Sequence, residues 1–273
     1  MKTIYYCFPG GRHKALTMSY DDGPPADRKL VALFNAHGIR GSFHLNGGLL
    51  GVDGRVSASE ARDLYAGHEI SCHTFTHPTI ARCPKELVAQ QILEDRKALE
   101  EVAGYPVRGM SFPNGSFDQD IIAMLPHLGI EYARTVFGTG SFALPDDFLR
   151  WNATCHHNNG LLERAKEFAG LSKTQYLYLL YVWGHSYEFD NDKNWHLIEE
   201  FCALAGRRDE VWYATNIEIV DYMHACKQLR FTAALDRVQN PTASPVWISV
   251  DGGAMRIEPG QTAWCGGLAK EER

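Results

Sequence analysis

Two adjacent aspartates, Asp21 and Asp22, end an apolar run and are followed at once by Gly-Pro-Pro. Neighbouring carboxylates at a chain reversal repel each other unless a positive charge lies close to them. A bound dication would supply that charge, because one aspartate can ligate it while the other stays ionised beside it. The pair therefore indicates a metal ion or a fixed cationic group at this turn.

A pair of histidines, His73 and His77, stands in the stretch Ser-Cys-His-Thr-Phe-Thr-His-Pro. Taken alone, this spacing is best interpreted as two partly buried histidines at a turn. The helical zinc-protease motif needs Glu after the first histidine, and Thr74 stands there instead. Pro78 also disfavours a helix at this point. Together with an aspartate from another strand end, however, two histidines are a common zinc-binding set.

The elements that must position these residues are short apolar segments that alternate with helical patterns. The expected strands cover residues 15–19, 40–45, 68–73, 107–112, 130–134, 147–151, 176–183 and 210–214, and the expected helices cover 26–37, 85–102, 118–127, 193–206 and 216–227. This alternation predicts parallel strands with helical crossovers in a closed or nearly closed barrel. Such barrels carry their chemistry at the carboxyl ends of the strands, and this is where Asp21, His73, the turn 112–115 and His185 are expected.

The pattern changes after about residue 228, where short strand-like pieces are separated by Asn-Pro, Asp-Gly-Gly and Pro-Gly turn signals. We therefore expect an α/β barrel over residues 1–227 and a small antiparallel β appendage over 228–273.

Composition narrows the function classes. Apolar residues make up 45% of the 273-residue chain and the net charge is −6, so neither nucleic acid nor an anionic membrane is an expected partner. No apolar run reaches the roughly 20 residues that a membrane-spanning helix needs. The N-terminal stretch does not have the pattern of a secretory signal, and the seven cysteines are scattered. A reducing, cytoplasmic location is expected. Nothing in the sequence predicts an oligomer.

The order of the motifs carries a family resemblance. Asp-Asp-Gly-Pro, then Ser-Cys-His-Thr-Phe-Thr-His, then Phe-Pro-Asn-Gly, then a strand-terminal histidine resembles the polysaccharide deacetylases with a NodB-homology domain, over roughly residues 15 to 190. The resemblance implies a distorted (β/α) barrel. It also implies one divalent metal, usually Zn²⁺ with Co²⁺, Ni²⁺ or Mn²⁺ as alternatives, and removal of an acetyl group from N-acetylated sugars by metal-bound water.

Residue roles follow from the same resemblance, position by position. Asp22, His73 and His77 would hold the metal, Asp21 would be the general base, and His185 the general acid. The turn at Asn114 and Gly115 would bind substrate, with a backbone N–H of Asn114 stabilising the oxyanion. These roles suit the chemistry, because a carboxylate can take a proton from acidified water and an amine leaves only when protonated.

The sequence departs from the family at one charged position. The arginine that normally precedes the Pro-x-Gly turn is replaced by Ser111, and Arg150 lies at another expected strand end. We therefore hypothesise an Arg150–Asp21 ion pair, with a surface pair between Arg150 and Asp146 or Asp147 as the alternative.

Several other side chains near these motifs have a structural interpretation beside a functional one. Trp151 and Trp183 either stack on a sugar or pack in the core. His156 and His157 are expected on the surface, with a place beside the site or the substrate as the alternative. Glu188 and Asp190 are expected in a solvated turn, with orientation of the His185 ring as the alternative.

Two alternative functions stay open. An O-acetyl esterase would use the same groups, but its alcohol leaving group would depend less on His185. A sugar-binding barrel without activity is slightly favoured by the missing arginine. It is disfavoured by the presence together of the five candidate site residues Asp21, Asp22, His73, His77 and His185. For the deacetylase, a small intracellular N-acetylated saccharide or a similar small amide is a more natural substrate than a wall polymer.

Overall fold

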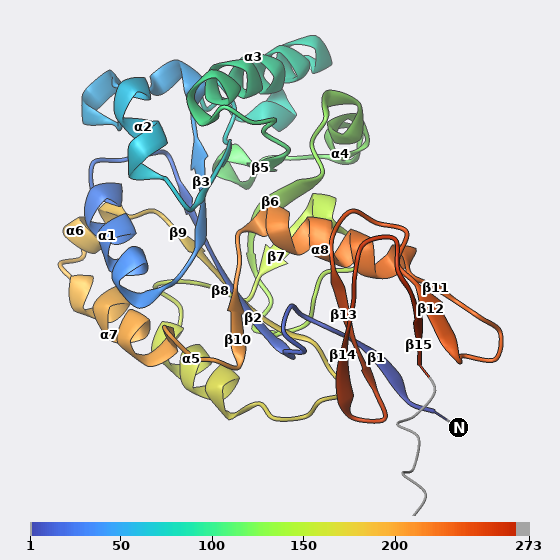
Figure 1. Ribbon diagram of the computed structural model, residues 1–273. Helices are drawn as coiled ribbons and strands as arrows, with labels where there is room; N and C mark the ends of the chain where they lie inside the picture. Colours follow the sequence, from blue (N-terminus) through green and yellow to red (C-terminus); the bar gives the residue numbers. More distant parts are fainter. Residues whose placement is uncertain (1, 266–273) are drawn as a thin grey trace, which may run out of the picture.

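The computed structural model describes residues 2–265, and its centre is a ring of parallel strands with helices around it (Figure 1). The strands follow one another around the sheet in the order β7-β6-β5-β4-β3-β2-β9-β8. In chain order they are β2 (Lys14–Asp21), β3 (Gly41–Leu45), β4 (Glu69–Cys72), β5 (Gly109–Ser111), β6 (Tyr132–Gly138), β7 (Trp151–Ala153), β8 (Cys155–His156) and β9 (Tyr178–Gly184).

A single extended segment closes this ring. β7 pairs with β6 at one end of the sheet, and β8 pairs with β9 at the other. Only Thr154 separates β7 from β8 in the chain, and its N–H donates to the carbonyl of Tyr181 in β9. The predicted barrel is therefore confirmed. It is distorted at β2, whose first residues pair with β10 (Val211–Tyr213) and whose last residues pair with β3.

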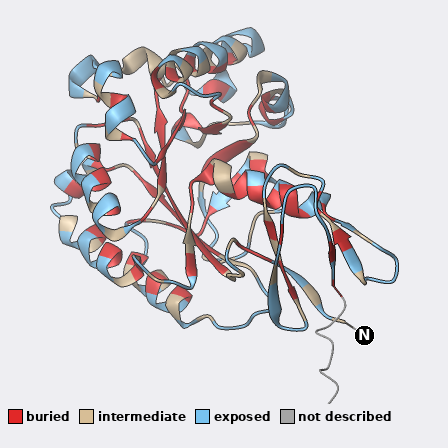
Figure 2. Cartoon of the chain, viewed as in Figure 1, coloured by how far each residue is buried: buried red, intermediate tan, exposed pale blue. Residues whose placement is uncertain are grey.

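Helices cover the outside of the barrel, and their apolar faces are buried against it (Figure 2). They are α1 (Asp27–His37), α2 (Ala58–Leu64), α3 (Lys85–Ala103), α4 (Gln119–Met124), α5 (Leu161–Gly170), α6 (Tyr187–Asn191), α7 (Trp195–Ala205) and α8 (Asn216–Gln228). Short 3₁₀ turns lie at Gly47–Leu49, Val52–Gly54, Ile80–Arg82, Pro113–Gly115, Leu125–Leu128 and Phe148–Arg150. None of the helices within residues 2–265 is both long enough and apolar enough to cross a membrane.

One predicted strand is wrong. Residues 147–151 were expected to be extended, but Phe148–Arg150 form a 3₁₀ turn and the strand begins only at Trp151. The Asp147 carboxylate accepts the N–H of Leu149 at 2.9 Å and so caps the turn, as an aspartate at a helix start commonly does. Helices α2 and α5 were not predicted from the sequence.

The C-terminal region forms two small antiparallel sheets, of which one recruits the start of the chain. β1 (Ile4–Cys7) pairs with β13 (Val246–Val250), which pairs with β14 (Gly253–Ile257). The other sheet contains β11 (Arg230–Phe231), β12 (Arg237–Gln239) and β15 (Thr262–Trp264). The part of the predicted appendage 228–273 that lies within the described residues therefore shares one of its sheets with the N-terminal strand, and residues 266–273 lie outside the described residues.

Helix α8 joins these sheets to the barrel. The Tyr222 hydroxyl donates to the carbonyl of Cys7 at 2.7 Å and accepts the N–H of Trp247 at 3.0 Å. One apolar cluster runs from Tyr181 of the barrel through Ile219 of α8 to Ile248 of β13. The appendage thus packs against the barrel through a common core.

Candidate active site

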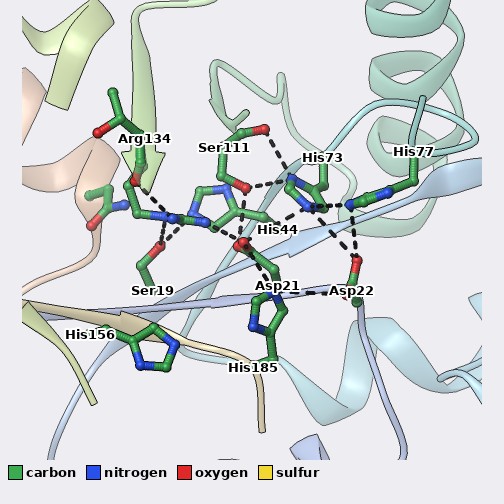
Figure 3. A network of polar contacts seen from close by, with 12 residues as sticks. Ser19, Asp21, Asp22, His44, His73, His77, Ser111, Arg134, His156 and His185 are labelled. Carbon is green, nitrogen blue, oxygen red and sulfur yellow. Dashed lines mark hydrogen bonds and ion pairs between the residues drawn. The ribbon is translucent and has the colours of Figure 1, made fainter. Parts of the chain in front are cut away.

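The two aspartates at the end of β2 face the same site because of an unusual backbone conformation. Asp21 is the last residue of β2 and is 2% exposed. Successive side chains of a strand point to opposite faces, but Asp22 has φ 76°, in the left-handed region that only a few residues other than glycine adopt. This turn brings the Asp22 carboxylate back beside that of Asp21 (Figure 3). Such strain in a non-glycine residue is typical of a functional site.

The two histidines approach Asp22 from the loop after β4. His73 Nε2 and His77 Nε2 each lie 3.8 Å from Asp22 Oδ1, and the two nitrogens are 3.1 Å apart. Thr74 and His77 also have positive φ, at 67° and 59°, which folds the loop so that both rings face one point. The ligand atoms of this aspartate and these two histidines lie within 4.8 Å of one another, as the motif predicted.

Hydrogen bonds around His73 leave Nε2, the nitrogen that faces Asp22, free to bind a metal. His73 Nδ1 is 3.0 Å from the carbonyl oxygen of Ser111, which can only accept, so the ring proton is on Nδ1. The lone pair of Nε2 then faces Asp22 and His77. A second bond fixes a metal-ligating imidazole in this way in most metal sites. The donor set therefore fits a divalent cation.

A buried carboxylate holds the backbone of this loop. Asp95 Oδ2 accepts the N–H of His73 at 2.9 Å, and Oδ1 accepts the N–H of Gly47 at 2.5 Å. Burial raises the pKa of Asp95 to about 7. From the neighbouring loop, the side-chain amide of Asn46 donates to the carbonyl oxygens of His73 and Thr74 at 2.7 and 2.8 Å. His73 is thus fixed from both sides.

The Asp21 carboxylate has different partners from that of Asp22. Arg134 of β6 is fully buried and donates through Nη2 to Asp21 Oδ2, while the Ser111 hydroxyl donates to Oδ1 at 3.0 Å. Burial alone would raise the pKa of Asp21, but Arg134 and the nearby histidines hold it well below its usual value. Within residues 2–265, no side chain donates a hydrogen bond to the carboxylate of Asp22. Asp22 is therefore the carboxylate left free to ligate, and Asp21 is held ionised beside it.

The hypothesised Arg150–Asp21 ion pair is wrong. Arg150 is exposed, donates to the side chain of Gln119 and lies 3.8 Å from Asp147, which is the surface alternative. Its 3₁₀ turn lies before β7 and outside the barrel, whereas Arg134 lies within β6 on the same face as Tyr132. Arg134 stood at the end of the expected strand 130–134, but β6 continues to Gly138, so the apolar residues on both sides of this arginine are the signal that could have indicated it.

The two tryptophans contact protein side chains. Trp151 is 1% exposed and packs edge-on against Tyr132 and Tyr181, so its predicted contact with substrate is corrected to core packing. Trp183 is 8% exposed and lies 4.3 Å from the Arg134 guanidinium. The Trp183 ring therefore packs against the guanidinium that pairs with Asp21.

His185 follows β9 and faces the two aspartates from the side opposite His73 and His77 (Figure 3). Its Nε2 lies 3.9 Å from Asp21 Oδ2 and 4.0 Å from Asp22 Oδ2. On the other edge of the ring, Nδ1 is 3.5 Å from Glu188 Oε1. Burial alone would lower the pKa of His185, but the carboxylates of Glu188 and Asp21 outweigh it and raise that pKa.

The carboxylate of Glu188 lies close to two further histidines, which were expected on the surface. His156 Nε2 and His157 Nε2 each lie 3.1 Å from Glu188 Oε2, and His157 is fully buried between Tyr20 and Phe189. The surface prediction for His157 is therefore wrong. His157 packs against the backbone of β9, where a Cβ on Gly184 would lie 2.1 Å from its Nδ1.

The turn after β5 carries Asn114 and Gly115. Asn114 has φ 55°, and its backbone N–H has no hydrogen-bond partner among the described residues. Gly115 uses its own N–H within the turn and packs so closely on β6 that a Cβ would lie 2.5 Å from Val136. Asn114 can therefore offer a donor, while Gly115 contributes the shape of the turn.

Comparison with known proteins agrees with the motifs. Residues 9–133 match the polysaccharide deacetylase family. The chain is 27% identical over 114 residues to a peptidoglycan-N-acetylglucosamine deacetylase of Bacillus cereus, covering 40% of each protein. It is 24% identical over 120 residues to a chitooligosaccharide deacetylase of Bradyrhizobium, covering 43% of this chain and 53% of that one. The alignments thus span about half or less of these relatives.

Solved structures share the fold at low identity. A candidate polysaccharide deacetylase from Mycobacterium smegmatis superposes with a TM-score of 0.60 at 17% identity, over 81% of this chain and 93% of that one. The CE4 domain of a xylanase from a Trinervitermes trinervoides hindgut metagenome gives 0.54 at 13% identity, over 78% and 92%. A CE4 family pseudoenzyme of Bacillus anthracis gives 0.51 at 14% identity, over 80% and 68%. Since a pseudoenzyme has this fold, activity must be argued from the site.

Proposed function

Because the chain belongs to the polysaccharide deacetylase family, we propose that it is a metal-dependent hydrolase that removes an acetyl group from an N-acetylated saccharide. One observation carries this proposal. Asp22, His73 and His77 face one point, and an ionised aspartate and a histidine, Asp21 and His185, stand beside it. These are the groups that metal-assisted amide hydrolysis requires.

Asp22, His73 and His77 would hold one divalent ion. Two imidazoles and a carboxylate suit zinc, with cobalt, nickel or manganese as alternatives. When bound, the ion would supply a Lewis acid for the acetyl carbonyl and lower the pKa of a water molecule. Ligation through His73 Nε2 is supported by the proton on its Nδ1.

Asp21 would act as the general base. The Arg134 guanidinium keeps its carboxylate ionised, and Ser111 fixes the second oxygen, so that the group is in its proton-accepting form before substrate binds. A carboxylate is basic enough to take a proton from a water molecule whose pKa has been lowered. Arg134 thus supplies the charge that the family places before its Pro-x-Gly turn.

His185 would act as the general acid. An amine is a poor leaving group until it is protonated, and an imidazolium can supply that proton near neutral pH. The raised pKa of His185 favours its protonated form. Glu188 contacts Nδ1 and so orients the opposite edge of the ring toward the aspartates. The free N–H of Asn114 is the proposed donor to the oxyanion.

We propose an N-acetylglucosamine-containing saccharide as the substrate. The names of the relatives support this, since they act on peptidoglycan N-acetylglucosamine and on chitooligosaccharides. The seven cysteines are all free thiols, in keeping with the cytoplasmic location expected from the sequence and thus with a soluble saccharide. The alternative of an inactive barrel loses its main support, because Arg134 supplies a guanidinium to Asp21 although the usual arginine is replaced by Ser111.

The direct test combines metal analysis with acetate release. Purified protein would be loaded with Zn²⁺ and incubated with chitin oligosaccharides and, separately, with O-acetylated xylo-oligosaccharides. We expect one metal ion per chain at this site and faster acetate release from the N-acetylated series. Faster release from the O-acetylated series would establish an esterase, and no release from either series by the metal-loaded protein would contradict the proposal.

A further inference from the structure

The barrel interior directly beneath Asp21 is polar. Ser19 of β2 and His44 of β3 are both fully buried, and Ser19 Oγ is 2.8 Å from His44 Nε2. The interior of a (β/α) barrel is usually filled by branched apolar side chains. Polar groups in such a place cost free energy unless they are paired. A paired layer of this kind, touching the partner of the catalytic base, points to a role in the reaction.

The direction of the hydrogen bonds in this layer depends on the Arg134 donor and on the tautomer of His44. Arg134 Nε–H can only donate, and it donates to Ser19 Oγ at 3.1 Å. The Ser19 hydroxyl has one proton, and we assign it to His44 Nε2, whose lone pair accepts it when the ring proton of His44 is on Nδ1. The chain of hydrogen bonds therefore runs in one direction, from Arg134 to Ser19 to His44. Without His44, the Ser19 hydroxyl would lose the acceptor that fixes its rotation.

The rigid shape of the guanidinium carries this constraint to Asp21. Ser19 anchors Nε, the carbonyl of Thr135 accepts from Nη1 at 2.9 Å, and the guanidinium carbon lies over the Trp183 ring, 4.3 Å from its centroid. Because the five N–H groups of an arginine lie in a fixed planar fork, these anchors determine where Nη2 points. It points at Asp21 Oδ2.

We propose that Ser19 and His44 are positioning residues for the catalytic base, acting through Arg134. Their hydrogen bonds fix the guanidinium, and the guanidinium fixes the Asp21 carboxylate in the orientation that receives the proton. Neither residue would touch substrate or metal. The inference rests on the proposed function, since Asp21 is the base only in that reaction.

A matched pair of serines tests the proposal in the zinc-loaded enzyme with chitin oligosaccharides. Ser71, like Ser19, is a fully buried hydroxyl of the barrel interior, but it bonds to Tyr132 at 3.0 Å and not to Arg134. We expect Ser19→Ala to lower kcat about tenfold to a hundredfold, as a displaced catalytic group does, with KM and zinc content unchanged. Ser71→Ala should keep kcat within about twofold, since each variant removes one ordinary hydrogen bond. Equal losses in both variants, or full activity in Ser19→Ala, would overturn the proposal.

Two substitutions of His44 provide the rescue experiment. His44→Leu removes the acceptor and should lower kcat as Ser19→Ala does. His44→Gln retains an oxygen acceptor at the end of the side chain and should recover most of the rate. A glutamine variant as slow as the leucine variant, at equal thermal stability, would contradict the hydrogen-bond chain.

A spectroscopic readout separates this inference from the proposed activity. The Arg134 Nε–H signal in a ¹⁵N NMR spectrum can be assigned by its loss in Arg134→Lys. We expect it to shift and exchange faster in Ser19→Ala and to stay unchanged in Ser71→Ala. If the wild type releases no acetate but the signal responds in this way, the proposed function fails and the positioning contact stands. An unchanged signal in Ser19→Ala overturns the positioning role whatever the activity.

Discussion

Two clusters in this protein have the same composition but different chemistry. Asp22, His73 and His77 form one, and His156, His157 and Glu188 form the other; in each, two imidazoles and one carboxylate have their ligand atoms within 4.8 Å of one another. Residue types and proximity alone would assign a metal ion to both. The positions of the ring protons distinguish them.

In the first cluster the hydrogen bonds leave lone pairs facing inward. His73 donates from Nδ1 to the Ser111 carbonyl, which frees Nε2, and the carboxylate of Asp22 is 3.8 Å from both rings. Left-handed backbone at Asp22 and His77 holds this arrangement. A cation is the group that satisfies converging lone pairs and a carboxylate.

In the second cluster the hydrogen bonds direct protons toward the carboxylate. The N–H of Asn158 donates to His156 Nδ1 at 3.2 Å, so the proton of a neutral His156 is on Nε2, which faces Glu188. The backbone N–H of His185 also donates to Glu188, at 3.1 Å. Although burial alone would raise it, the imidazoles around Glu188 hold the pKa of its carboxyl far below the usual value. This cluster holds an anion in place beside His185, where the first cluster would hold a cation.

The largest expected effect comes from a matched pair of histidine substitutions, one in each cluster. His77→Ala should remove the metal and abolish turnover, because three protein ligands leave no redundancy. His156→Ala should keep stoichiometric metal. Metal content per chain after dialysis checks both. A His77→Ala protein with full metal and wild-type turnover, or loss of metal from His156→Ala, would remove the distinction between the clusters.

Asp21→Asn should keep the metal and lose about 10³–10⁴ in kcat, within the range of a general base. The substitution keeps the shape of the side chain but removes the proton acceptor. Its metal content and acetate release would be compared with those of Asp22→Asn, which we expect to lose metal. If Asp21→Asn also loses metal, both aspartates are ligands and the roles assigned to them must be revised.

His185→Ala should lower kcat on an N-acetylated saccharide by about 10²–10³, the effect of removing a general acid. The loss should be far smaller on an activated acetyl ester, because its leaving group needs no proton. Parallel rate measurements on the two substrates provide the check. Equal losses on both would instead indicate a binding or structural role for His185.

The ligand set was predictable from sequence because each of its motifs is local. Asp22 follows one strand, and His73 and His77 lie in one loop, so a short stretch fixes each group and the barrel brings the strand ends together. The alternation of strands and helices predicted that barrel for the same reason. The elements that differ from the prediction are short: the turn at Phe148–Arg150 replaces most of an expected strand, and helices α2 and α5 were missed.

The contacts that were not predicted from the sequence depend on which strands become neighbours in the fold. Arg134 reaches Asp21 across 113 residues of chain, and Ile4 near the start of the chain pairs with Val250 near its other end. Arg150 and Arg134 both stood at expected strand ends, and the sequence does not say which side of the barrel wall each faces. His157 was placed on the surface because nothing local marks a histidine as buried.

The smallest of the expected effects would test the second cluster directly. Glu188→Gln removes the negative charge beside His185 but keeps a hydrogen-bonding side chain of the same size. We expect kcat to fall about tenfold to a hundredfold, as when the hydrogen-bond partner of a functional histidine is lost, with metal content unchanged. The carboxylate of Glu188 raises the pKa of His185. Its removal should therefore lower that pKa and move the alkaline limb of the pH–rate profile to lower pH.

Asp190→Asn is the control for this variant. Asp190 lies on the same short helix α6 and accepts a hydrogen bond from Trp195 at 2.7 Å, away from His185. It should leave the alkaline limb where it is in the wild type. A Glu188→Gln enzyme that loses metal would show that the second cluster also binds a cation. One with an unchanged pH profile would show that Glu188 supports the fold of the turn without acting on His185.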